Sequence, residues 1–198
     1  MNAYTPEQQR LLLAFARQTL QAITAGEPAP TVDLNTLPPE LREPRACFVT
    51  LRHAATHQLR GCTGTLVARR PLAQEVVFMT MQTACHDPRF FPVTPGEVPE
   101  LAIEISVLTP PQTLVFSGPD DLVSRLRPGV DGVTLMLNNR RATFLPQVWL
   151  SYPDPCVFLD LLCEKMGGLP GDWRSPQIEV ETYEAIVIEE TGSTALNR

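Results

Sequence analysis

The run from Leu101 to Leu108 constrains the fold most, because apolar residues recur along it with period two. This period is typical of a β-strand with one face against a core, and Pro110-Pro111 ends the strand. Earlier in the chain, Ala46–Arg52 predicts another strand, followed by a polar turn at His53–His57. The stretch Leu59–Leu66 then returns as the second arm of a hairpin. Strands joined by so short a turn pair in the antiparallel sense.

Segments with helical signals alternate with these strands. The residues Thr5–Gln8 form a capping box with proline at the first helical position, which predicts a helix to about Ile23. A second helix is predicted over Pro71–Ala84, and a third, capped by Asp154, should run to Met166. Helices mixed with hairpin-joined strands predict an α+β protein with a largely antiparallel sheet flanked by helices.

The carboxyl-terminal half predicts further strands. Gly132–Leu137 and Ala142–Leu145 indicate a hairpin around Asn138-Asn139, residues that tolerate a positive φ. A short helix is expected at Asp120–Leu126. Alternation over Ile178–Glu189 predicts one final strand.

The length of 198 residues and a hydrophobic share of 43% predict one domain over residues 5–190, with tails at 1–4 and 191–198. The net charge of −6 argues against nucleic-acid binding, which needs a basic surface to release counterions. Five cysteines without a CxxC pair, no signal peptide and no apolar run of transmembrane length predict a cytoplasmic protein with free thiols and no membrane contact.

The stretch Leu59–Leu66 is the part of the chain richest in groups that can do chemistry. It holds a cation, a thiol, two hydroxyls and two glycines, Gly61 and Gly64. Glycine permits a positive φ or a close approach of another group to the backbone. One interpretation is a pocket with a backbone floor and with Cys62 and Arg60 at its edge. The other is a bulged strand whose glycines serve sheet packing and whose cysteine is buried as a small apolar residue. The sequence leaves both open.

Cys62 is the candidate nucleophile of the chain. A thiol reacts as the thiolate, and its reference pKa is about 8.5. Arg60 shares a face with Cys62 if the strand is regular, and would favour the thiolate, whereas a bulge at Gly61 would break this alignment. A thiol nucleophile also needs a base, and the histidines nearest in sequence are His53 and His86.

Three charged residues outside this stretch are further candidates for a site. Glu104 faces away from the apolar side of its strand, toward either solvent or the wall of a cleft. A buried carboxylate there would need a partner such as Arg60 or Arg89. Asp87 and Arg89 can also pair locally and fix their own loop.

The sequence predicts no metal site and no cofactor. Cys85, His86 and Asp87 are adjacent, and adjacent residues rarely converge on one ion. No phosphate-binding loop, dinucleotide fingerprint or radical SAM cysteine triad is found, so iron–sulfur chemistry would belong to a partner.

Several short blocks together give the chain a likeness to a known family, and they occur in that family's order. They are Leu59–Thr65, Asp87–Phe90, Ile103–Pro110, Gly129–Gly132, Phe144–Val148 and Gly168–Pro170 with Trp173. The chain resembles the AMMECR1 domain family, in particular the members called AmmeMemoRadiSam system protein A. The family usually has Ile at the place of Thr63 and often a second Pro at the place of Phe91. Neither difference affects a side chain that is a candidate for catalysis.

The resemblance implies an α+β fold with a larger and a smaller subdomain and the Arg-Gly-Cys motif near their junction. The system name implies that such proteins travel with a Memo-like protein and a radical SAM protein, and it assigns no reaction. Two functions follow as hypotheses. The first is a binding or adaptor protein with a cleft for a small molecule or a partner segment. Its residues would be Arg60, Gly61, Cys62, Thr63, Gly64, Thr65, Asp87, Arg89 and Glu104. The second is an enzyme that uses Cys62, assisted by Arg60, as nucleophile or covalent carrier in a radical SAM-linked modification pathway.

Overall fold

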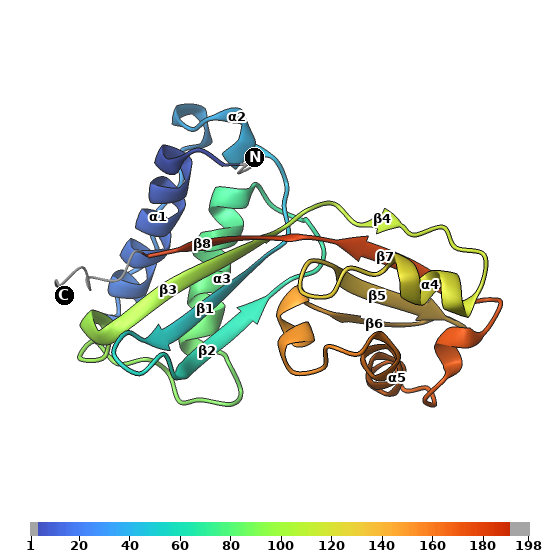
Figure 1. The fold of residues 1–198 in the computed structure, drawn as a ribbon. Helices are drawn as coiled ribbons and strands as arrows, with labels where there is room; N and C mark the ends of the chain where they lie inside the picture. Colours follow the sequence, from blue (N-terminus) through green and yellow to red (C-terminus); the bar gives the residue numbers. More distant parts are fainter. Residues whose placement is uncertain (1–3, 191–198) are drawn as a thin grey trace, which may run out of the picture. The chain divides into compact units, whose positions relative to one another are not determined.

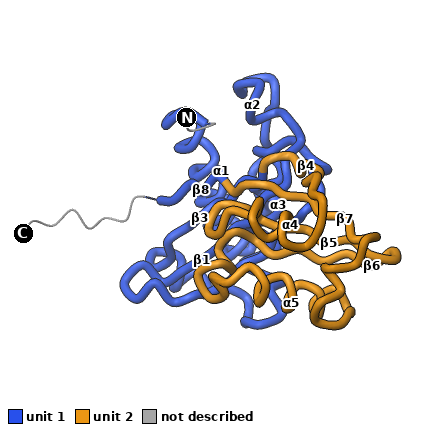
Figure 2. Tube along the Cα trace, turned by 45° about the vertical axis from the view of Figure 1, so that its right-hand side comes forward, with its two compact units in different colours: residues 1–108, 186–198 blue, residues 109–185 orange. Residues whose placement is uncertain are grey.

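The computed structural model describes residues 4–190 and divides into two compact units (Figures 1 and 2). Unit 1 holds the described residues up to Leu108 and those from Ile186 on, and unit 2 is Thr109–Ala185. Each unit has a four-stranded sheet, helices and a hydrophobic core of its own. The predicted α+β fold with largely antiparallel sheets and a larger and a smaller subdomain is confirmed. Of the predicted tails, residues 1–3 and 191–198 lie outside the described residues, and Tyr4 is buried.

Unit 1 combines one sheet with two long helices. Its elements are α1 (Pro6–Thr24), η1 (Leu34–Thr36), α2 (Pro39–Arg42), β1 (Cys47–His53), β2 (Leu59–Gly64), α3 (Leu72–Cys85), η2 (Val98–Glu100), β3 (Leu101–Leu108) and β8 (Ala185–Glu189). The capping box at the start of α1 is present, with reciprocal bonds between Thr5 and Gln8. Among residues 4–190, no helix combines the length and the hydrophobicity that a membrane span needs.

The sheet of unit 1 has the strand order β2-β1-β3-β8, and α1 and α3 cover one of its faces (Figure 1). Alternate residues such as Val49 and Ile105 are buried in the core beneath these helices. The intervening residues point to the opposite face because side chains alternate along a strand. We call this the helix-free face, and its members are Phe48, Thr50 and Arg52 of β1, Cys62 of β2, Ala102, Glu104 and Ser106 of β3, and Glu189 of β8.

Unit 2 packs its helices against a second antiparallel sheet of order β4-β7-β5-β6. Its elements are β4 (Gln112–Thr113), α4 (Pro119–Arg125), β5 (Gly132–Leu137), β6 (Arg140–Phe144), η3 (Pro146–Leu150), α5 (Pro155–Lys165), η4 (Asp172–Arg174) and β7 (Glu179–Tyr183). The Trp149 ring stacks on Phe158 with centroids 3.7 Å apart, and Trp173 is buried. Both tryptophans therefore anchor the packing of unit 2.

The single final strand predicted over Ile178–Glu189 is wrong. The segment forms β7 and β8, which belong to the sheets of different units. The break falls at Glu184, whose backbone exchanges hydrogen bonds with Thr109: its N–H donates to the Thr109 hydroxyl at 2.8 Å, and its carbonyl accepts from the Thr109 N–H at 2.9 Å. Alternation alone does not mark such a break, since both strands have one buried face.

Candidate functional site

Strand β2 carries the Arg-Gly-Cys motif at one edge of the sheet of unit 1. Its pairing with β1 is irregular, because Leu51 lies opposite Gly61 while Arg52 lies opposite Leu59. Arg60 is therefore the extra residue of a β-bulge. The bulge breaks the regular alignment that would have placed Arg60 beside the Cys62 thiol.

The Arg60 guanidinium instead binds the loop that precedes η2. Its Nε donates to Oε1 of Glu97 at 2.6 Å and its Nη2 to the carbonyl of Phe91 at 3.0 Å. The Arg60 side chain is only 11% exposed, so this is a largely desolvated ion pair. Hydrogen bonds from Arg60, followed by those from Thr94, lower the pKa of Glu97 to about 2. Arg60 thus holds the loop against the edge strand.

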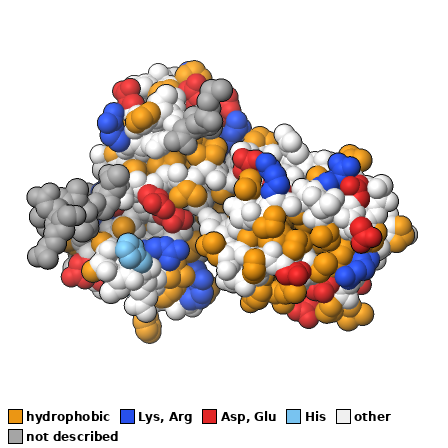
Figure 3. Space-filling model, viewed as in Figure 1, with side chains coloured by type: hydrophobic (Ala, Val, Ile, Leu, Met, Phe, Trp, Pro, Cys, Tyr) orange, Lys and Arg blue, Asp and Glu red, His pale blue; other side chains and the backbone are white. Residues whose placement is uncertain are grey.

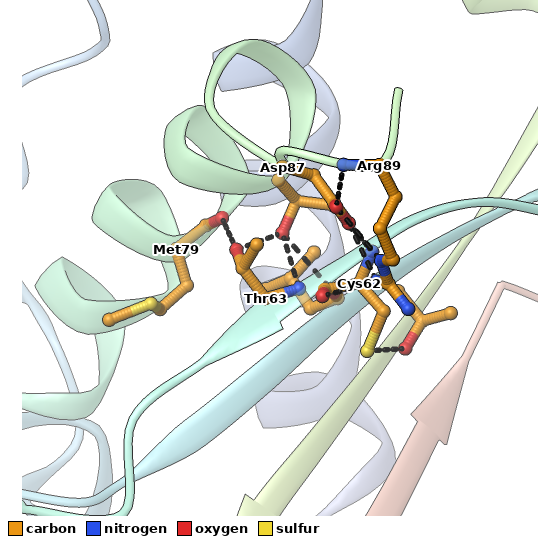
Figure 4. Close-up of polar contacts among 8 residues, drawn as sticks. Cys62, Thr63, Met79, Asp87 and Arg89 are labelled. Carbon is orange, nitrogen blue, oxygen red and sulfur yellow. Dashed lines mark hydrogen bonds and ion pairs between the residues drawn. The ribbon is translucent and has the colours of Figure 1, made fainter. Parts of the chain in front are cut away.

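Asp87 and Arg89 clamp the backbone of Cys62, and Figure 4 shows both side chains converging on that residue. Oδ2 of Asp87 accepts the Cys62 N–H at 2.8 Å, and Nη2 of Arg89 donates to the Cys62 carbonyl at 3.0 Å. The two side chains also pair with each other, with 2.7 Å between Nη2 and Oδ2. One ion pair therefore satisfies the outward backbone groups of an edge strand, groups that otherwise attract another strand.

Hydrogen bonds set the electrostatics of the clamp and outweigh burial, which by itself would raise the pKa of Asp87. The Asp87 side chain is 2% exposed and accepts hydrogen bonds from Arg89 and from the Cys62 backbone, which hold the pKa of its carboxyl well below its usual range. The local pairing of Asp87 with Arg89 that the sequence suggests is present. The sequence does not indicate that this pair also binds the Cys62 backbone.

The thiol of Cys62 lies on the helix-free face and is partly exposed. The Thr50 hydroxyl, from the residue directly opposite on β1, donates to the Cys62 sulfur at 3.4 Å. Arg89 adds positive charge nearby: its pKa is raised chiefly by Asp87, with a contribution from Cys62. Within residues 4–190, no histidine or carboxylate hydrogen-bonds this sulfur, so His53 and His86 do not act as its base in this arrangement.

Gly61 and Gly64 are required by close packing, since neither has a positive φ. A Cβ on Gly61 would lie 3.0 Å from the carbonyl oxygen of Thr83 on α3. A Cβ on Gly64 would lie 2.2 Å from the Phe48 ring. The glycines let α3 and the Phe48 ring approach the backbone of β2 from its two faces.

The two threonines of the motif do not share the face of the thiol. The Thr63 hydroxyl lies 2.7 Å from the Thr83 hydroxyl, on the side of α3, and Thr83 in turn donates to the carbonyl of Val49. The Thr65 hydroxyl accepts from the N–H of Val67 in the loop after β2. Both hydroxyls therefore fix the local fold.

Glu104 lies in one row with the thiol, because Thr50 pairs with Cys62 on one side and with Glu104 on the other. The row runs thiol, hydroxyl, carboxyl across three neighbouring strands, with about 4.8 Å between adjacent strands. Burial raises the pKa of Glu104, Arg52 opposes this shift, and Glu189 adds to it. The expected partners Arg60 and Arg89 bind Glu97 and Asp87 instead, and Arg52 takes their place near Glu104.

The sequence patterns do not indicate three residues of the candidate site: Thr50, Arg52 and Glu97. The register of the predicted hairpin is a signal that could have found Thr50, since it sits opposite the cysteine. The capping-box pattern from Thr94 to Glu97 shows that Glu97 is fixed locally, but it does not indicate Arg60 as partner. No group of three or more His, Cys, Asp or Glu residues in the described chain could hold a metal ion.

Comparison with known proteins identifies the family of the chain. A profile of the AMMECR1 family matches residues 13–188, most of the sequence. The chain belongs to the AMMECR1 family. Protein MJ0810 of Methanocaldococcus jannaschii is 30% identical to it over 96% of this chain and 94% of the relative. Protein MK0488 of Methanopyrus kandleri is 38% identical over 76% of this chain and 73% of the relative.

A solved structure from the same family has a similar fold. The crystal structure of uncharacterized protein PH0010 from Pyrococcus horikoshii matches with a TM-score of 0.79 and 30% sequence identity. The match covers 91% of this chain and 90% of that one. The resemblance drawn from the sequence blocks is thereby confirmed at the level of family and fold.

Proposed function

We propose that this AMMECR1-family chain is a binding or adaptor protein of the cytoplasm whose site is centred on Cys62. It presents the edge strand β2 and the helix-free face to a small molecule or a partner segment, and it acts alongside Memo-like and radical SAM proteins. The clamp of Asp87 and Arg89 on the Cys62 backbone carries this proposal. Holding one partly exposed residue by an ion pair whose carboxylate is buried favours a preorganised recognition surface.

A second function, enzyme or covalent carrier, is favoured by one specific observation. The Cys62 sulfur accepts a hydrogen bond from the Thr50 hydroxyl and lies near the Arg89 guanidinium. A hydroxyl donor and a nearby cation are typical surroundings of a reactive thiol. Such a thiol suits attack on an electrophile, while Glu104, two strands away, is the nearest carboxyl in the row.

Alkylation separates a reactive Cys62 from a structural one. At neutral pH, iodoacetamide is expected to modify Cys62 at least about tenfold faster than Cys85, because burial raises the pKa of the Cys85 thiol. Mass spectrometry resolves each cysteine, and Arg89→Gln should slow the reaction of Cys62 while the exposed Arg10→Gln leaves it unchanged. If Cys62 reacts only after unfolding, the thiol is structural and the carrier function fails.

Affinity for the two partner proteins tests the adaptor function. The Memo-like and radical SAM proteins encoded by the same genome are titrated against the chain by calorimetry. Arg89→Ala is expected to weaken binding of at least one partner by about tenfold or more, with Arg10→Ala as the matched control. Cys62→Ser should retain binding if the surface acts by recognition alone. Absence of binding to either protein at micromolar concentrations would contradict the adaptor function.

A further inference from the structure

A pocket opens on the helix-free face of unit 1, beside the Cys62 row. Its volume is about 370 Å³, within the range of small-ligand pockets. The lining residues that matter here are Arg52, His57, Ala102, Glu104, Glu189 and Glu190. Figure 3 shows acidic, basic and histidine side chains gathered over β1 and β3. The pocket therefore combines both signs of charge with a small apolar floor.

Glu190 is already neutralised within unit 1. Nε of Arg17 donates to its Oε1 at 2.9 Å, and the Arg17 Nη2 binds its other carboxylate oxygen. The Ile103 N–H also donates to Glu190, at 2.9 Å. This carboxylate forms a fixed wall of the pocket, and its hydrogen bonds to Arg17 and Ile103 serve the local fold.

Glu104 and Glu189 are the acidic groups that remain for a ligand. Within residues 4–190 neither of them forms an ion pair with a basic side chain, and Glu104 receives only a long hydrogen bond of 3.5 Å from Ser106. The charge of Glu189 contributes to the raised pKa of Glu104, after burial. Two neighbouring carboxyl groups of this kind are stabilised by a cation between them.

Arg52 supplies the opposite charge on the same pocket. Its Nη1 donates to the His57 carbonyl at 3.4 Å, a long bond that leaves most of its donors unused. The guanidinium fork is suited to bidentate binding of a carboxylate. The pocket thus has a place for an anion beside a place for a cation.

We propose that this pocket binds a small zwitterion of the α-amino acid class, with its ammonium group between Glu104 and Glu189 and its carboxylate on Arg52. The inference rests on the proposed function, because it names a ligand class for the same face. The size of the pocket selects a single amino acid or a similar small molecule. The Ala102 floor leaves room for a short aliphatic side chain.

Three probes with the same carbon chain test the inference: L-norvaline, n-pentylamine and pentanoate. Each is titrated into the ¹⁵N-labelled full chain while the amide signals of Ala54, His57 and Ala102 are followed by NMR. L-norvaline is expected to shift these signals with a Kd at least about tenfold lower than that of either half-probe, since each charged contact adds to affinity. An amine that binds as tightly as norvaline, a carboxylate that does so, or no shift at these amides at tens of millimolar would each overturn the inference.

Two charge-removing variants locate the contacts. Glu104→Gln should weaken norvaline and pentylamine by about tenfold and spare pentanoate, whereas Arg52→Gln should weaken norvaline and pentanoate and spare the amine. The exposed Glu179→Gln on β7 is the matched control. If a variant fails to fold, as judged by circular dichroism, the three-probe comparison in the unaltered chain still decides. Failure here is distinguishable from failure of the adaptor function, because the two experiments share neither variant nor readout.

Discussion

Replacing Asp87 by Asn is expected to lower the free energy of unfolding by about 3 kcal/mol. The carboxylate is 2% exposed and accepts four hydrogen bonds, one from the Cys62 backbone and three from Arg89. An amide offers one acceptor oxygen in place of two and turns an NH₂ group toward donors. The Arg89 guanidinium then loses its counter-charge, and the edge of β2 loses a backbone partner.

Urea unfolding at pH 7 measures this loss. The exposed Asp120→Asn at the start of α4 serves as control and is expected to change stability by less than about 1 kcal/mol. A loss for Asp87→Asn as small as that of the control would contradict a structural role for the clamp.

The pH dependence of stability provides a second readout of the clamp. Arg89 keeps the folded-state pKa of Asp87 below its value of about 3.9 in the unfolded chain. The stabilisation is therefore fully present above the unfolded-state pKa and is lost as the pH falls through the range below it. Between pH 5 and pH 2 the unaltered chain should lose more stability than Asp87→Asn. Parallel curves would show that the clamp does not titrate as described.

Gly64→Ala is expected to destabilise the protein by about 2–3 kcal/mol. The added Cβ would lie 2.2 Å from Cγ of Phe48 and 2.6 Å from the carbonyl oxygen of Cys47. The ring can rotate away only in part, and the carbonyl belongs to the backbone of β1 and cannot yield without shifting the strand. The substitution therefore forces β2 away from its partner.

Gly96→Ala is the matched control, because nothing lies within 4 Å of its Cβ position. It should change stability by less than about 0.5 kcal/mol. Combining Gly64→Ala with Phe48→Ala should restore part of the loss in a double-mutant cycle, since it removes the ring but leaves the carbonyl contact. Additive effects of the two substitutions would locate the strain elsewhere.

Most of the fold of unit 1 was predictable from local patterns. Strand β3 covers Leu101–Leu108, the residues whose alternation predicts it. Helix α1 begins after the capping Thr5, as the capping box indicates. These features depend on neighbours within a few residues, and a sequence displays such neighbours directly.

The candidate site was predictable only as a set of residues. The sequence drew attention to Cys62, Asp87 and Arg89, and the structure brings these three together. In the structure, however, Arg60 pairs with Glu97, and the Thr63 side chain lies on the side of α3. Periodicity gives the face of a side chain only while a strand stays regular, and the bulge at Arg60 ends that regularity.

Ordered motifs and short-range periodicities are properties of the sequence, and they are enough to predict the family, the α+β class and the residue types available for chemistry. That a carboxylate 25 residues further along the chain binds the Cys62 backbone becomes visible in the folded molecule alone. The folded molecule likewise shows that Glu184 separates two sheets. The physical reason is that a hydrogen-bonding group needs some partner when it is buried, while the identity of that partner depends on which distant segment the fold brings beside it.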